Sequence, residues 1–238
     1  MLVLTNLRYA IFRLFWNPKA QRALDGVAFG RKVVESRERS WREEAEDSIL
    51  LKAVSHWRDD CESWFAGSYD RLPETLRVNP QSPEKEWVES WLDGIGASRI
   101  PWFSGPGSAW EMPFERGSAV GEAKTIMTAL HDTGRITRQE AVSMLPVLGL
   151  DPSPGERILD LCASPGSKTT QICEHLEDSG AVIANEVISG RVNTLVTNVQ
   201  RHGSKSAVVV QHDGRHFPKV PGDGFDGVLV DVPCTGSG

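Results

Sequence analysis

The sequence has few cysteines, no excess of positive charge and no long hydrophobic run. Its four cysteines, Cys61, Cys162, Cys173 and Cys234, are far apart and form no C-x-x-C pair, which argues against a zinc site and against a small disulfide-linked fold. We therefore expect reduced thiols, no metal and an intracellular protein, cytoplasmic or nuclear. The net charge is −6, whereas a nucleic-acid binder typically carries a basic balance or stripe. Composition alone therefore does not indicate a nucleic-acid partner.

Membrane insertion is also not indicated by the sequence. No apolar stretch approaches the roughly 20 residues that a membrane-spanning helix needs. Arg8 and Arg13 interrupt the apolar opening segment, and the first acidic residue is Asp25. This pattern is typical of an amphipathic surface helix, and a transit peptide is the alternative.

Aromatic residues divide the chain. All eight tryptophans and both tyrosines lie at or before Trp110, which indicates a domain boundary between residues 110 and 150. We predict a helical region over 1–66, a small α+β subdomain over 67–117 and a larger α/β domain over 118–238. Ser40 and Glu43 form a capping-box pattern that predicts a helix ending at Gly67. Its aromatic stripe is interpreted as a core face, with a base-stacking surface as the alternative.

The middle of the chain predicts a short strand, a helix and an extended segment, followed by a loop and two helices. Their ranges are 75–78, 83–92, 98–103, 104–117, 121–132 and 138–148. The loop is predicted because 104–117 is dense in glycine, proline and serine. From residue 157 onward, strands at 157–162, 181–185, 206–213 and 225–233 alternate with helices at 168–176 and 189–203. Apolar strands alternating with helices predict a Rossmann-like α/β fold, a parallel sheet covered on both faces.

Ligands of such sheets bind beyond the carboxyl ends of the strands. The first strand ends in a tight turn at Pro165 and Gly166, and the next helix directs its free N–H groups there. Glu186, Asp213 and Asp231 lie at the ends of the next three strands, so three carboxylates converge on one edge with the Cys234 thiol. A carboxylate at Glu186 suits two ribose hydroxyls, and Asp213 suits an adenine amino group. Any one of these acids alone is better interpreted as a helix cap or turn residue, and only the three together favour a site.

The sequence argues against two other kinds of nucleotide site, a dinucleotide site and a phosphate-binding loop. The first strand-end turn lacks G-x-G-x-x-G, which argues against a dinucleotide cofactor. Ser167 separates Gly166 from Lys168, which breaks the Gly-Lys-Ser/Thr sequence that a phosphate-binding loop requires.

Two motifs are unusually specific: D-x-C-A-x-P-G-x-K-T at 160–169 and D-x-P-C-x-G-x-G at 231–238, with NEV at 185–187 and HDG at 212–214 between them. With these motifs, the chain from residue 70 onward resembles the Sun-domain (NSUN) family of RNA cytosine-C5 methyltransferases. Segments at 72–80, 99–103 and 134–146 are similar to those of the eukaryotic-type tRNA-modifying branch. Residues 118–238 would then be a partial S-adenosylmethionine-binding domain.

The resemblance implies a role for each matched residue. The methionine part of the donor would lie against Cys162, Ala163, Ser164, Pro165, Gly166, Ser167 and Lys168. Glu186 would hold the ribose and Asp213 the adenine, with Arg191 and Gly214 also in the donor pocket. Asp231 would contact the target cytosine as well as the pocket, and Cys234 would assist product release. Asp231 and Cys234 are therefore the expected catalytic residues.

The family's covalent nucleophile is normally a different cysteine, in a later Thr-Cys-Ser motif that is not found in residues 1–238. Cytosine C5 reacts only after a thiolate adds to C6, so we expect this chain alone to be inactive. Cys234 as nucleophile is the alternative.

The predicted function is methylation of RNA, with tRNA favoured over rRNA, by a monomer without a metal or a membrane. Two alternatives stay open. One is a non-catalytic protein that keeps the donor pocket and binds RNA or the cofactor. The other is a methyltransferase for proteins or small molecules, against which the Asp-x-Pro-Cys motif argues.

Overall fold

The computed structural model describes residues 49–68, 71–220, 222 and 224–232. Contacts divide the chain into two units, one with the described residues up to Leu72 and one with the described residues from Pro73 onward. Predictions for residues 1–48 and 233–238, including the capping box at Ser40 and the role of Cys234, lie outside the described residues. None of the described helices is long and apolar enough to cross a membrane.

In the smaller unit the described residues form two short helices, α3 (Ile49–Val54) and α4 (Cys61–Ser68). The prediction of one continuous helix to Gly67 is therefore wrong. The second helix begins after Asp60, whose carbonyl accepts hydrogen bonds from Ser63 Oγ and Trp64 N. Trp57 and Trp64 are 83% and 40% exposed, so they do not form the core face that we expected.

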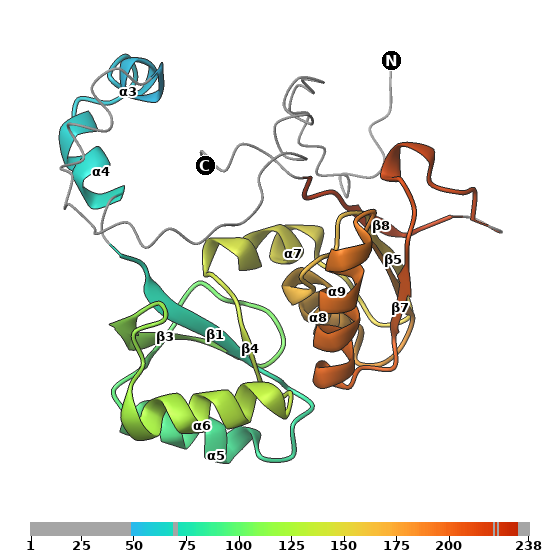
Figure 1. Ribbon diagram of the computed structural model, residues 1–238, viewed down its shortest axis with the longest axis horizontal. Coiled ribbons are helices and arrows are strands. Elements are labelled where there is room, and N and C mark those ends of the chain that lie inside the picture. Colours follow the sequence, from blue (N-terminus) through green and yellow to red (C-terminus); the bar gives the residue numbers. More distant parts are fainter. Residues whose placement is uncertain (1–48, 69–70, 221, 223, 233–238) are drawn as a thin grey trace. The chain divides into compact units, whose positions relative to one another are not determined.

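The larger unit begins with an antiparallel sheet covered by two helices (Figure 1). Its strand order is β2-β3-β1-β4. The elements are β1 (Pro73–Val78), α5 (Lys85–Gly94), β2 (Ser98–Arg99), β3 (Ser108–Glu115), α6 (Gly121–Asp132) and β4 (Ile136–Arg138). Leu76 and Val78 of β1 pack with Trp110 and residues of both helices in one core. Because side chains alternate along a strand, Thr75 and Arg77 face away from these helices.

One prediction for this region is wrong. Residues 104–117 were expected to be a loop, but β3 pairs with β1 along most of its length. Pro113 is tolerated because it lies at the register shift opposite Glu74, where regular pairing is interrupted. On its other side β1 pairs with β4, so residues 136–138 belong to the antiparallel sheet. The division of the chain into folding domains stays a prediction.

A second sheet, entirely parallel, follows with strand order β7-β6-β5-β8. The elements are η1 (Val142–Met144), α7 (Leu145–Leu150), β5 (Arg157–Asp160), α8 (Ser167–Leu176), β6 (Ala181–Asn185), α9 (Ser189–His202), β7 (Ala207–Val210), η2 (Gly214–His216) and β8 (Gly227–Leu229). The prediction of a Rossmann-like α/β fold is confirmed. The strand order reverses beside β5, which places the ligand edge at the end of that strand.

The prediction of a helix over 138–148 placed its start too early. Glu140 accepts the N–H groups of Val142 and Ser143 through its carboxylate, so helical structure starts only at η1. We also expected helices on both faces of the parallel sheet, but the described helices cover only one face. Helices α7, α8 and α9 pack against Ile158, Val182 and Ala184, which share one face. No other described helix covers the opposite face.

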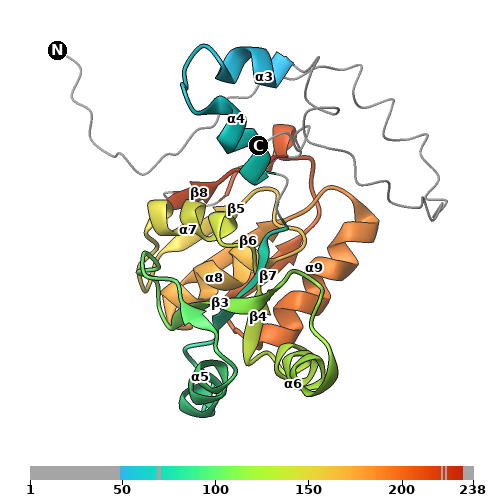
Figure 2. The same cartoon turned by 90° about the vertical axis from the view of Figure 1, so that its left-hand side faces the viewer.

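The antiparallel sheet is joined to α8 by a buried ion pair. This sheet lies between the helices α5 and α6 on one side and α8 on the other in both views (Figures 1 and 2). Arg77 of β1 donates to both carboxylate oxygens of Glu174, at 3.0 and 2.9 Å, and both side chains are at most 1% exposed. His202 of α9 also contacts Glu174, at 3.2 Å. These contacts hold β1 and the end of α9 against α8.

Candidate cofactor-binding site

The loop from β5 to α8 forms the centre of the candidate site. Gly166, the residue before the helix, has φ of +108°, and a Cβ there would lie 3.1 Å from Leu195 Cδ1. Glycine is therefore required on both conformational and steric grounds. The first backbone bond of α8 runs from Thr170 N to Gly166 O. The N–H groups of Ser167, Lys168 and Thr169 therefore have no acceptor within the helix and can bind a negatively charged group.

Two carboxylates flank this loop in different environments. Asp160 is 1% exposed and accepts a hydrogen bond from Thr169 Oγ1 at 2.7 Å. Burial raises the pKa of Asp160 to about 6, although that hydrogen bond and Lys168 oppose the change. Asp231 is more than half exposed and lies 2.7 Å from Lys168 Nζ. Lys168 thus links the helix start to the end of β8.

Glu186 is a buried carboxylate at the end of β6, only 3% exposed. Its Oε1 accepts the N–H of Ile188 at 2.9 Å, and its Oε2 lies 3.5 Å from Arg191 Nη1. Arg191 also donates to Ser164 O at 2.7 Å, and Ser164 Oγ donates to Arg191 O. Arg191 therefore fixes Glu186 against the loop, as a rigid acceptor for ligand hydroxyl groups.

Sequence reasoning missed Asn185, which joins three strand ends. Its amide nitrogen donates to Leu161 O and His212 O, both at 3.0 Å, and its oxygen accepts His212 N at 2.8 Å. This side chain is 1% exposed. The only available signal was a polar residue at the end of an apolar strand, which is also typical of a turn.

The Cys162 thiol is half-buried and electrostatically disfavoured as a thiolate. Burial, together with the nearby carboxylates of Asp160 and Glu186, raises its pKa to about 11. Cys162 is therefore a neutral packing and contact group at neutral pH. Its neighbour Ala163 is buried beside Leu195.

Asp213 begins the short helix η2 after β7. Its carboxylate accepts the backbone N–H of Arg215 at 3.0 Å and pairs with the Arg215 side chain at 2.5 Å. The hydrogen bonds from Arg215 hold the pKa of Asp213 well below its usual range. Gly214 packs on Leu161, and a Cβ there would lie 3.1 Å from Leu161 Cγ. An adenine would therefore have to share or displace the Arg215 contact.

The structure thus brings most of the predicted residues together. Direct contacts link Ser164, Lys168, Glu186, Arg191 and Asp231 to the loop, while Asp213 and Gly214 follow the neighbouring strand β7. Cys234 lies outside the described residues. The edge is rich in carboxylates and has one helix start, which suits a ligand with hydroxyl groups and a positive charge better than a chain of phosphates.

Comparison with known proteins identifies the same region. Residues 147–238 match the family model described as 16S rRNA methyltransferase RsmB/F. A tRNA (cytosine(49)-C(5))-methyltransferase of Pyrococcus abyssi is 36% identical over 181 residues, covering 76% of this chain and 55% of that protein. The 25S rRNA (cytosine-C(5))-methyltransferase nop2 of Schizosaccharomyces pombe is 42% identical over 168 residues, covering 70% of this chain and 26% of that protein.

The fold comparison agrees with these matches. A solved methyltransferase homologue from Pyrococcus horikoshii superimposes with a TM-score of 0.65 at 26% identity, covering 83% of this chain and 63% of that one. The chain spans about half the length of the first relative and about a quarter of the second. The matched family model, the sequence motifs and the shared fold lead to one conclusion: the chain is similar to the RsmB/F, or Sun-domain, family of RNA cytosine-C5 methyltransferases, whose model matches residues 147–238.

Proposed function

We propose that this chain binds S-adenosylmethionine at the ends of β5, β6 and β7 and serves in methylation of cytosine C5 in RNA. The observation that carries the proposal is Glu186, a carboxylate 3% exposed at the end of β6. It is held by Ile188 N–H and Arg191 beside the loop at 162–168. Two carboxylate oxygens fixed in this way suit the two vicinal hydroxyls of the donor ribose.

The remaining donor groups have matching partners. The free N–H groups at the start of α8 suit the methionine carboxylate. The acidic side chains around the loop suit the positively charged amino and sulfonium groups, because opposite charges attract strongly at partly buried sites. Asp213 supplies an acceptor for the adenine amino group, in competition with Arg215. When bound, S-adenosylmethionine supplies the methyl group.

Lys168 and Asp231 face the expected position of the base. Their charged ends lie 2.7 Å apart, so Lys168 fixes the position of the Asp231 carboxylate. A hydrogen bond between Asp231 and the target cytosine at N3 would make C6 more susceptible to attack.

The attacking thiolate is not supplied by the described cysteines of this unit. Burial raises the pKa of Cys162 to about 11 and that of Cys173 to about 12. Both thiols therefore stay protonated at neutral pH. We keep the proposal that residues 1–238 alone bind the donor without turnover, with Cys234 as the alternative nucleophile.

The proposal also covers the RNA substrate, the oligomeric state and the cellular location of the protein. We propose tRNA ahead of rRNA as substrate, a monomer without a metal, and an intracellular location. The relatives support RNA as the class of substrate, because their names include both tRNA and rRNA methyltransferases.

The test combines donor binding with methyl transfer. Calorimetry with S-adenosylmethionine should show one site, and isotope transfer to tRNA should stay at background unless a thiolate is supplied. Failure to bind the donor would refute the proposed function. Donor binding without any RNA binding would instead favour a protein that only retains the pocket.

A further inference from the structure

We propose that a second site lies beside the donor loop and holds a ribose-phosphate unit of the RNA strand; this inference rests on the proposed function. A cavity of about 320 Å³ separates β4 and the segment after it from the start of α8 and the end of α9. This volume is at the lower end of ligand pockets, which hold about 300–1,000 Å³. Of the donor-site residues only the Pro165–Lys168 loop lines it, whereas Glu186, Asp213 and Asp231 do not.

The first argument is an unpaired buried oxygen in the cavity wall. Gln139 is 4% exposed, and its Oε1 has no hydrogen-bond partner. The orientation of its amide is determined by its surroundings, because Nε2 donates to Ser143 O at 2.9 Å and to Gln171 Oε1 at 3.1 Å. Gln171 in turn donates to Met144 O. Turning the Gln139 amide over would place oxygen against oxygen at two contacts, so Oε1 must face the cavity and needs a donor.

A second unpaired atom belongs to His202. This residue is 8% exposed and lines the same cavity. Its Nε2 lies 3.2 Å from Glu174 Oε1 and donates to it, whereas its Nδ1 has no partner. Two buried polar atoms of residues in the cavity wall therefore lack partners. The 2′-hydroxyl of a ribose can supply the donor that Gln139 Oε1 needs.

The third argument is positive charge without carboxylate partners. Arg116 and Arg201 line the cavity, and among the described residues no carboxylate lies within ion-pair distance of either. Arg201 Nη1 instead donates to His131 Nε2 at 2.6 Å, while His131 Nδ1 faces Ile136 O. Burial and the positive charge of Arg201 lower the pKa of His131, so this histidine stays neutral and leaves the Arg201 charge uncompensated.

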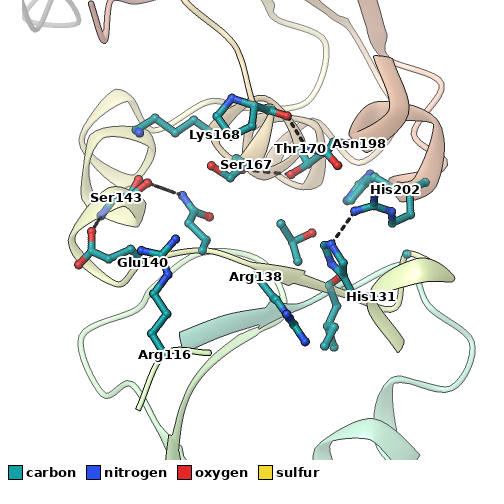
Figure 3. A pocket seen from close by; sticks show the side chains of 17 residues that line it. Arg116, His131, Arg138, Glu140, Ser143, Ser167, Lys168, Thr170, Asn198 and His202 are labelled. Carbon is teal, nitrogen blue, oxygen red and sulfur yellow. Dashed lines mark hydrogen bonds between the residues drawn. The ribbon is translucent and has the colours of Figure 1, made fainter. Parts of the chain in front are cut away.

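The polar and charged side chains are spread along the cavity from one end to the other. Figure 3 shows Arg116 and Glu140 at one end of the cavity and His131 and His202 at the other, with Ser167 and Thr170 along the α8 wall. Glu140 is engaged by the N–H groups of Val142 and Ser143. Arg116 at one end, Arg201 beside His131 at the other and the unpartnered Gln139 Oε1 in the cavity wall match a strand whose phosphates flank a ribose.

This chemistry distinguishes RNA from DNA. A phosphate can bind the arginines in either nucleic acid, but only RNA carries a 2′-hydroxyl that can donate to Gln139 Oε1. The site would thus select the class of nucleic acid independently of the base that is methylated. It would also place the strand next to the loop that holds the donor.

The test measures binding of the full chain to a labelled oligoribonucleotide, to the DNA of the same sequence and to its 2′-O-methyl form. The Arg116→Gln, Arg201→Gln double variant should lower the slope of log affinity against log salt by about 1 to 1.5, since each phosphate contact contributes about 0.7 for a single strand. Gln139→Leu should weaken RNA binding roughly fivefold and leave DNA binding unchanged, because one hydrogen bond is lost. Arg99→Gln and Gln200→Leu, which lie outside the cavity, are the matched controls.

Each outcome decides a separate point. RNA binding that neither cavity variant changes would overturn the second site and leave the proposed function standing. Absence of RNA binding by the unmutated chain, with donor binding intact, would overturn both the site and the proposed substrate. If CMP bound as tightly as the oligoribonucleotide, the proposal that the cavity holds part of an RNA strand would be overturned, and a site for a free nucleotide would be indicated. Arg116 is exposed, so Arg116→Gln alone still gives a reading if Gln139→Leu fails to fold.

Discussion

Replacing Glu174 by glutamine tests the ion pair that joins β1 to α8. The carboxylate is 1% exposed and receives both Nε and Nη2 of Arg77. Glutamine keeps the volume but leaves the Arg77 guanidinium buried without its opposite charge. Removing one partner of a buried pair typically costs about 3–5 kcal/mol. We expect the free energy of unfolding at neutral pH to fall by that amount, measured by urea denaturation followed by circular dichroism.

The loss should depend on pH in a defined way. Burial alone would raise the pKa of Glu174, but the charges and hydrogen bonds of Arg77 and His202 outweigh it and lower the pKa. A lowered folded pKa contributes stability above the unfolded value of about 4.3 and loses it as the pH falls through the folded pKa. The difference between Glu174→Gln and the unmutated chain should therefore be full above about pH 5 and shrink below about pH 4.

A matched control separates burial from charge. Glu84 pairs with Arg135 through two hydrogen bonds on the surface, so Glu84→Gln should change stability far less. If Glu174→Gln were as stable as the unmutated chain at pH 7, the account of how the two sheets are joined would be wrong. A loss that did not change between pH 7 and pH 3.5 would also contradict it.

Three further predictions concern the donor loop. Gly166→Ala should lower the free energy of unfolding by about 1–3 kcal/mol because of its left-handed φ, whereas Gly149→Ala, with nothing within 4 Å, should raise it by about 0.5–1 kcal/mol; equal melting temperatures would contradict this. Iodoacetamide should label Cys162 slowly at pH 8 and faster toward pH 11, and mass spectrometry showing fast labelling at pH 7 would disprove its protonated state. Asp213→Ala should weaken donor binding in calorimetry by about 1–3 kcal/mol, and unchanged affinity would remove Asp213 from the site.

The α/β half of the fold was predictable because its signals are local. Apolar strands, helix periodicity and the turn at Pro165 and Gly166 are all contained within short segments of sequence. Glu186 and Asp231 were correctly predicted to lie at strand ends on one edge of the sheet, because parallel strands bring their carboxyl ends together. Strand lengths were overestimated, since β8 covers only Gly227–Leu229.

Features that depend on distant partners could not be predicted. Residues 104–117 have the composition of a loop, yet pairing with β1 makes Ser108–Glu115 a strand. Arg77 and Glu174 are 97 residues apart, and nothing near either residue indicates that both are buried. Gln139 gave no signal for the same reason, because its amide orientation depends on Gln171, 32 residues away.

Calorimetric titration of S-adenosylmethionine into the unmutated chain and Glu186→Ala tests the central claim most directly. We predict one donor site in the unmutated chain and binding weaker by about 1–3 kcal/mol in the variant, since a buried acceptor of the ribose hydroxyls is lost. The melting temperature of the variant serves as the control for folding. Equal affinity in both proteins, or no binding by the unmutated chain, would contradict the donor site at the end of β6.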